Sequence, residues 1–147
     1  MSYDRADWHY GGDFPSDLPD EAGGTHIGMF IAWAIIQDLA GPDLLDHSSD
    51  AIAQVRNREI SGRDFLFNEC DGKFWEEMLS DEGNSFAKKY YEKSYLEDYE
   101  QALGTGLPTL YHVADSWENF DKIAPRITRA WTQWRGWGQK SWWQFWK

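Results

Sequence analysis

The sequence predicts an all-α fold, a compact multi-helix domain around a buried central helix at about residues 25–40. The stretch THIGMFIAWAIIQDLA is apolar on nearly every side, as in helices that are buried all round. It is shorter than the ~20 residues that a membrane-spanning helix needs. Aromatic residues recur at helical spacing in two later stretches, 86–103 and 117–134. Together these observations predict a helical domain packed around one apolar helix.

The chain has 147 residues, which is the size of a single domain. We expect one helical domain at residues 1–135, including an irregular N-terminal arm at 1–24, and a Trp-rich basic tail at 136–147. The single cysteine, Cys70, excludes an intramolecular disulfide and favours a reducing compartment. The N-terminal residues show no basic region followed by an apolar stretch, so we expect a cytoplasmic protein without a signal peptide.

The ends of the central helix are marked by residues with known terminal preferences. Thr25 is expected to cap its N-terminus through the hydroxyl, and Gly41-Pro42 is expected to end it. Gly28 inside the helix costs ~1 kcal/mol relative to Ala, which suggests that a neighbouring aromatic ring packs closely on its backbone.

The remaining helices follow from periodicity and capping signals. Ser61 with Asp64 resembles a capping box and predicts a helix that ends near Gly72. Asp115 with Glu118 likewise predicts the start of a last helix. Pro125 is expected to kink or split this helix, and Gly136 and Gly138 are expected to end it. Further helices are predicted from Asp43 or Ser48 to Arg58, over residues 73–79 (KFWEEML), and from Asn84 or Ser85 to Leu103, with 109–113 (TLYHV) extended.

Charge is distributed unevenly along the chain, whose formal net charge is −11. Residues 122–147 carry six basic side chains and no Asp or Glu, whereas residues 1–121 carry eight basic and 25 acidic side chains. Such an acidic body would repel nucleic-acid phosphates and attract a basic protein. The sequence therefore favours a protein partner, makes nucleic acid unlikely, and leaves self-association open.

Common catalytic and cofactor motifs are absent from the sequence: GxxxxGK[ST], GxGxxG, CxxC, HExxH and GxSxG. A polar cluster is conceivable from His9 and His26 with the nearby Asp7 and Asp13, and with Asp4 these residues offer mixed nitrogen and oxygen ligands. Their spacing matches no known metal motif. We therefore expect no metal and no cofactor, and interpret the two histidines as hydrogen-bonded where the arm crosses the central helix; a metal-dependent or other enzyme remains the alternative.

The densest acidic cluster surrounds an aromatic residue and is predicted to bind a partner. It consists of Glu69, Asp71, Glu76 and Glu77 beside Trp75. Paired carboxylates also perform acid–base catalysis, and many acidic surfaces are only solvated, so both readings stay open. The neighbouring carboxylates would raise the pKa of Cys70, which predicts a poor nucleophile.

The C-terminal region holds six Trp within residues 131–146, mixed with Arg and Lys. We assign Trp134 and Trp137 to partner binding, because Trp is enriched at interfaces. Two alternatives remain: the rings fold back onto the core, or residues 131–147 bind a membrane or nucleic acid.

Several segments of the chain resemble an uncharacterised bacterial domain family. The resemblance covers about residues 3–135 and rests on the motifs DWH (7–9), THIGMF (25–30) and GRDF (62–65). Members of that family are small cytosolic proteins, some of them similar in context to immunity proteins of interbacterial toxin systems. The resemblance implies no catalytic residues, and residues 136–147 lie outside it. The expected function is thus a non-enzymatic binding protein, an immunity protein whose acidic face meets a basic toxin domain.

Overall fold

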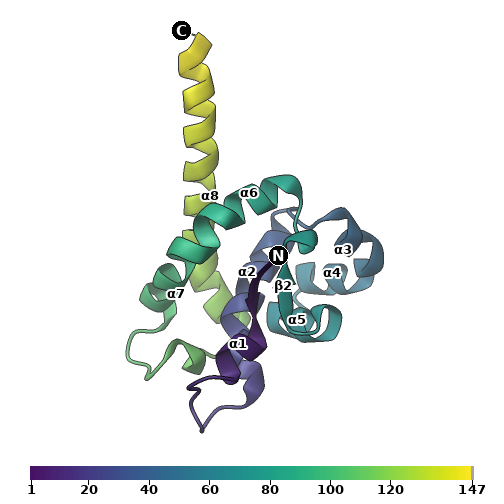
Figure 1. The fold of residues 1–147 in the computed structure, drawn as a ribbon, viewed down its shortest axis with the longest axis vertical. Coiled ribbons are helices and arrows are strands. Elements are labelled where there is room, and N and C mark those ends of the chain that lie inside the picture. The colour runs from purple at the N-terminus through teal and green to yellow at the C-terminus, as the bar shows by residue number, and fades with distance from the viewer. Residues whose placement is uncertain (147) are drawn as a thin grey trace.

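The structure, a computed structural model, describes residues 1–146 and the side chains of residues 1–136. It is a mostly α-helical domain with a two-stranded antiparallel sheet, which confirms the predicted fold class (Figure 1). None of its described helices is both long enough and apolar enough to cross a membrane. In chain order the elements are β1 (Ser2–Arg5), α1 (Ala6–Tyr10), η1 (Asp20–Gly24), α2 (Thr25–Ile36), α3 (Pro42–His47), α4 (Ser49–Arg56), α5 (Gly62–Cys70), β2 (Lys73–Trp75), η2 (Glu76–Met78), α6 (Asp81–Tyr90), η3 (Tyr91–Tyr95), α7 (Leu96–Leu103), η4 (Leu110–His112) and α8 (Trp117–Trp146).

Helix α2 is the buried centre of the domain, as predicted. Every residue from Thr25 to Ile35 is buried. The helix ends at Ile36, four residues earlier than expected, because Asp38 adopts a left-handed conformation with φ of 61°. Thr25 does not cap it, because the 3₁₀ helix η1 runs directly into α2; its hydroxyl instead accepts a 3.2 Å hydrogen bond from Arg63.

Glycines allow α2 and α5 to approach each other closely. A Cβ on Gly28 would lie 2.5 Å from the Cα of Arg63, and a Cβ on Gly62 would lie 2.6 Å from the carbonyl carbon of Gly28. The expectation that an aromatic ring packs on Gly28 is therefore wrong: the backbone at the start of α5 occupies that place. The Ser61–Asp64 capping box predicted for α5 is present.

The N-terminal segment is more regular than predicted. Strand β1 pairs with β2 in the register Asp4↔Phe74 and Arg5↔Lys73, and the short helix α1 follows directly. The helix expected over 73–79 is instead strand β2 followed by the 3₁₀ helix η2. This pairing buries Tyr3 and Asp4 against the body.

The long helix predicted up to Leu103 is divided by a π-helical turn, η3, between α6 and α7. Ser80 caps α6, accepting a 3.1 Å hydrogen bond from the N–H of Gly83. The π-helical turn accommodates one extra residue, which explains why the aromatic stripe over 86–103 keeps both Tyr90 and Tyr95 buried although they are five residues apart. Residues 109–113, expected to be extended, contain the 3₁₀ helix η4.

Helix α8 begins at Trp117. Ser116, rather than the predicted Asp115, caps it: the Ser116 hydroxyl oxygen accepts a hydrogen bond from the N–H of Asn119. The helix is not split at Pro125 and continues past Gly136 to Trp146. Its first half packs on the body through four buried residues, whereas the C-terminal end extends away from the body (Figure 1). Those residues are Phe120, Ile123, Ile127 and Trp131.

Candidate functional site

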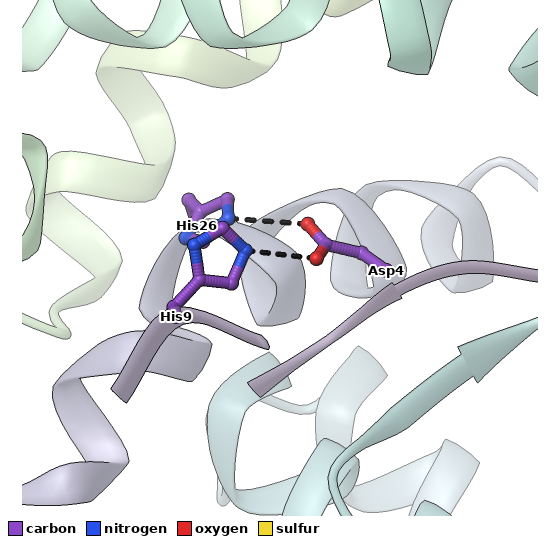
Figure 2. Close-up of side chains that lie close together, drawn as sticks. All are labelled: Asp4, His9 and His26. Atoms are coloured by element: carbon purple, nitrogen blue, oxygen red, sulfur yellow. Dashed lines mark hydrogen bonds and ion pairs between the residues drawn. The ribbon is translucent and has the colours of Figure 1, made fainter. Parts of the chain in front are cut away.

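Three side chains from β1, α1 and α2 meet where the N-terminal segment crosses the central helix. Asp4, His9 and His26, here named the Asp–His cluster, turn one carboxylate toward two imidazoles (Figure 2). The Oδ1 of Asp4 lies 2.8 Å from Nε2 of His9, and its Oδ2 lies 3.3 Å from Nε2 of His26. The imidazole rings meet nearly edge to face, with centroids 4.5 Å apart.

The cluster is largely removed from solvent. The His26 side chain is fully buried, whereas Asp4 and His9 keep 10% and 17% of their side-chain surface exposed. His9 and His26 are both hydrogen-bonded to Asp4 at the place where the N-terminal segment crosses the central helix. Asp7 instead accepts two hydrogen bonds from Arg5, and Asp13 is exposed in the loop after α1, so neither belongs to the cluster.

Tyrosine hydroxyls surround the Asp–His cluster. Tyr91 donates a 2.6 Å hydrogen bond to Oδ2 of Asp4, and the Tyr111 hydroxyl lies 2.7 Å from Nδ1 of His9. The hydroxyl of Tyr95 donates to the backbone carbonyl of His26. These contacts fix the orientation of the carboxylate and of the His9 ring.

Two buried polar atoms beside the cluster have no hydrogen-bond partner among the described residues. They are Nδ1 of His26 and the hydroxyl of Tyr99, whose rings are 6.0 Å apart. A buried polar atom without a partner is costly, so most such atoms in native proteins have one. His26 is therefore held from one side only, through Asp4.

The protonation states in the cluster follow from burial and hydrogen bonding. Burial alone would raise the pKa of Asp4, but hydrogen bonds from His26, His9 and Tyr91 bring that pKa well below its usual range. Burial lowers the pKa of His26 more than Asp4 raises it, so this imidazole is neutral at pH 7. Burial, assisted by the charge of Asp4, raises the pKa of Tyr91 far above 10. The cluster thus combines one carboxylate with a neutral, buried imidazole.

This chemistry suits proton sharing or ligation more than nucleophilic catalysis. Both ring nitrogens of His9 are engaged, by Asp4 and by Tyr111, so neither is free to activate a nucleophile. Cys70 is no candidate nucleophile either, because burial and the charge of Glu69 raise its pKa to about 12.

The predicted acidic, aromatic face contains a pocket of about 280 Å³ between α3, α5 and the β2–η2 segment. Its lining combines three acidic residues and Trp75 with apolar and neutral polar ones, and we call this site the acidic groove. The lining residues are Asp43, Leu44, His47, Ser48, Glu69, Trp75, Glu77 and Met78. The three acidic residues and Trp75 are all exposed, and Trp75 has 40% of its surface accessible. The groove therefore places three carboxylates around one accessible indole.

The other residues predicted for the partner-binding face lie elsewhere or are already paired. Asp71 lies 3.7 Å from the ammonium of Lys73, and Glu76 lies 3.3 Å from the N-terminal amine and 3.8 Å from Lys88. Trp134 is partly buried and stacks on Trp131 at 5.5 Å. The side chain of Trp137 lies outside the described residues.

Comparison with family models gives one informative match. A model described as "Domain of unknown function (DUF7832)" matches residues 2–113, about three-quarters of the chain. The chain belongs to this family. The matched segment includes the Asp–His cluster and the acidic groove and ends before α8, so it stops short of the C-terminal limit expected from the sequence resemblance. Comparison with curated proteins and with solved structures gives no match.

From the sequence, Asp4 was named without being singled out, and Tyr91 and Asp43 were missed. Asp4 was one of three nearby aspartates, and nothing in the sequence distinguished it before β1 and β2 were known to pair. Tyr91 is one of several tyrosines in the aromatic stripe over 86–103, and nothing in the sequence indicated that its hydroxyl would donate a hydrogen bond to Asp4. Asp43 lies 26 residues before Glu69 and joins the groove only through the packing of α3.

Proposed function

We propose that this protein is a non-enzymatic protein-binding module whose acidic groove receives a basic side chain of its partner. The acidic groove is the observation that carries the proposal. Three carboxylates and an accessible indole line one small pocket, which complements the charge and shape of a Lys or Arg side chain. Its volume of about 280 Å³ is at the lower end of small-molecule sites, which usually span ~300–1,000 Å³.

The chain itself provides an example of the contact that we expect. The ammonium of Lys73 lies 5.7 Å from the centroid of the Trp75 ring. A cation over an indole face is attracted by the negative face of the π-system. The strongly acidic charge of residues 1–121 would accelerate the approach of a basic protein over longer distances.

The specific function that we propose is immunity: in the bacterial cytoplasm, the protein binds a basic toxin domain such as a nuclease and neutralises it. The resemblance of the sequence motifs to immunity-associated domains supports this proposal, as does the acidity of the body. Immunity needs only tight binding, which agrees with a surface built of carboxylates and an aromatic ring.

The experiment is affinity capture from the native lysate, followed by a quantitative binding measurement with the captured protein. The test variant is Asp43→Asn/Glu69→Gln/Glu77→Gln, which removes three charges from the groove. The matched control, Asp13→Asn/Glu59→Gln/Glu100→Gln, removes three charges from exposed residues on other elements.

We expect the groove variant to bind at least ~10-fold more weakly than the wild type, and the control to stay within about threefold. Equal binding by the two triple variants would overturn the proposed site. Co-expression with the captured partner then tests immunity. If cells that express the captured partner survive only when the wild-type chain is co-expressed, the immunity proposal is supported. If a chain that still binds the partner gives no protection, the immunity proposal is refuted.

A further inference from the structure

The Asp–His cluster has the composition of a transition-metal site. Imidazole nitrogens combined with a carboxylate suit zinc, iron, nickel and related divalent ions. One candidate ligand atom from each of Asp4, His9 and His26 lies within 4.8 Å of the others. Three protein ligands are the number found in open zinc sites, where a fourth position is left for water or another ligand.

The spacing of the ligand atoms fits a shared ion. Tetrahedral metal–ligand bonds of ~2.0–2.2 Å place neighbouring ligand atoms roughly 3.4 Å apart. The separation between Asp4 and His26 is 3.3 Å, and that between Asp4 and His9 is 2.8 Å. These two contacts end at different oxygens of Asp4, so an ion would replace both hydrogen bonds. Because the three candidate ligand atoms all lie within 4.8 Å of one another, their separations need to change by no more than about 1.4 Å to reach that geometry.

Two of the three ligands, Asp4 and His9, have surroundings that resemble the outer shell of metal sites, in which hydrogen bonds orient the ligands. Tyr111 contacts the ring nitrogen of His9 that faces away from Asp4, and Tyr91 holds the carboxylate of Asp4. Such contacts fix which nitrogen is presented to the ion. The backbone N–H of Arg5 also donates a 2.9 Å hydrogen bond to Oδ1 of Asp4.

We propose that Asp4, His9 and His26 bind one divalent transition-metal ion of the zinc class, and that this ion fastens the N-terminal segment to the central helix. The three ligands come from β1, α1 and α2, so the ion joins the first ten residues to the core. The partly exposed edge of His9 is the route by which the ion enters.

The test measures Zn²⁺ and Co²⁺ binding to the full chain after chelator treatment, by calorimetry and by the visible absorption of Co²⁺. The test variants are His9→Gln and Tyr111→Phe, which alter the accessible side of the cluster and leave the buried His26 intact. The control is His47→Gln, because His47 is exposed and, among the described residues, its ring is hydrogen-bonded only to the backbone of its own helix. Circular dichroism checks that each metal-free variant is folded.

We expect one ion per chain for the wild type and for His47→Gln. We expect at least 10-fold weaker binding for His9→Gln and about 10-fold weaker binding for Tyr111→Phe. Hydrogen exchange should slow at residues 2–10 when the metal is added. Failure of the wild type to bind Zn²⁺ and Co²⁺, or equal affinity in folded His9→Gln, overturns the site; binding without slower exchange overturns the fastening role.

Discussion

Tyr91 donates a 2.6 Å hydrogen bond to Asp4, joining η3 to β1 across 87 residues of sequence. The donor hydroxyl is buried, and the acceptor is a carboxylate whose pKa is held below its usual range. Hydrogen bonds to charged groups contribute more to stability than neutral ones. This contact therefore ties the N-terminal segment to a helix distant in sequence.

Replacing Tyr91 with Phe should lower the free energy of unfolding by about 1.5–3 kcal/mol, because the buried carboxylate of Asp4 loses a donor. Urea denaturation of the metal-free protein measures this change. Tyr10→Phe is the control, since Tyr10 is only partly buried and makes no side-chain hydrogen bond among the described residues. A change no larger than the control's would show that the bond contributes nothing to stability.

The contact between α2 and α5 should not tolerate a methyl group. In Gly62→Ala the new Cβ would lie 2.6 Å from the carbonyl carbon of Gly28 and 2.9 Å from the Cβ of Ala32. Overpacking of this kind costs ~1–3 kcal/mol or more. Gly136→Ala provides the opposite case. Its new Cβ would have no atom of the described residues within 4 Å, and position 136 lies inside α8, so up to ~1 kcal/mol of stabilisation is expected there. Thermal unfolding distinguishes the two; equal midpoints would contradict the close approach.

Cys70 should react slowly with iodoacetamide in the folded protein. Burial and the charge of Glu69 raise its pKa to about 12, so at pH 8 almost none of it is thiolate. An unfolded cysteine has a pKa near ~8.5, so labelling should be at least ~100-fold faster in urea. Mass spectrometry of quenched samples gives both rates. Comparable rates in the two states would mean that the thiol is neither buried nor influenced by Glu69.

Removal of residues 136–147 should leave the domain folded. Among the residues whose side chains the structure describes, α8 contacts the body as far as Arg135, including Trp131 against Trp33 at 6.0 Å and Arg135 3.5 Å from Glu82. The thermal midpoint should therefore change by only a few degrees. Partner binding by a chain that ends at Arg135 should match that of the full chain, because the acidic groove lies on other elements. Loss of binding on truncation would transfer the site to the Trp-rich segment.

Local signals made much of the fold predictable. The apolar run at α2 and the Ser61–Asp64 pair each depend on neighbours within a few residues, and both appear as predicted. The sheet was not predictable in the same way. Strands β1 and β2 are short and lie about 70 residues apart, so their pairing is decided by tertiary contacts.

The candidate sites show the same division between local and long-range information. His9 and His26 were expected to be hydrogen-bonded where the arm crosses the central helix, but their shared partner is Asp4 and not Asp7 because β1 presents Asp4 to the core. The carboxylate of Asp7, by contrast, accepts two hydrogen bonds from the guanidinium of Arg5. Glu69, Trp75 and Glu77 were identified from their density in the sequence, whereas Asp43 joins them only through the packing of α3.

The π-helical turn at Tyr91–Tyr95 sets the rotational phase between two groups of aromatic residues. Before it, Phe86 and Tyr90 stack at 5.1 Å within the core; within it, Tyr91 and Tyr95 reach Asp4 and the carbonyl of His26. Loss of one residue at 92–94 would restore α-helical geometry and leave α6 and α7 in phase. Tyr90 and the residue now at position 95 would then share a face, and Tyr91 would lie about 100° away from it. The number of residues in this turn is thus tied to the hydrogen bond between Tyr91 and Asp4: an evolutionary lineage can substitute the exposed positions 92–94, but a deletion there would withdraw the Tyr91 hydroxyl from the carboxylate.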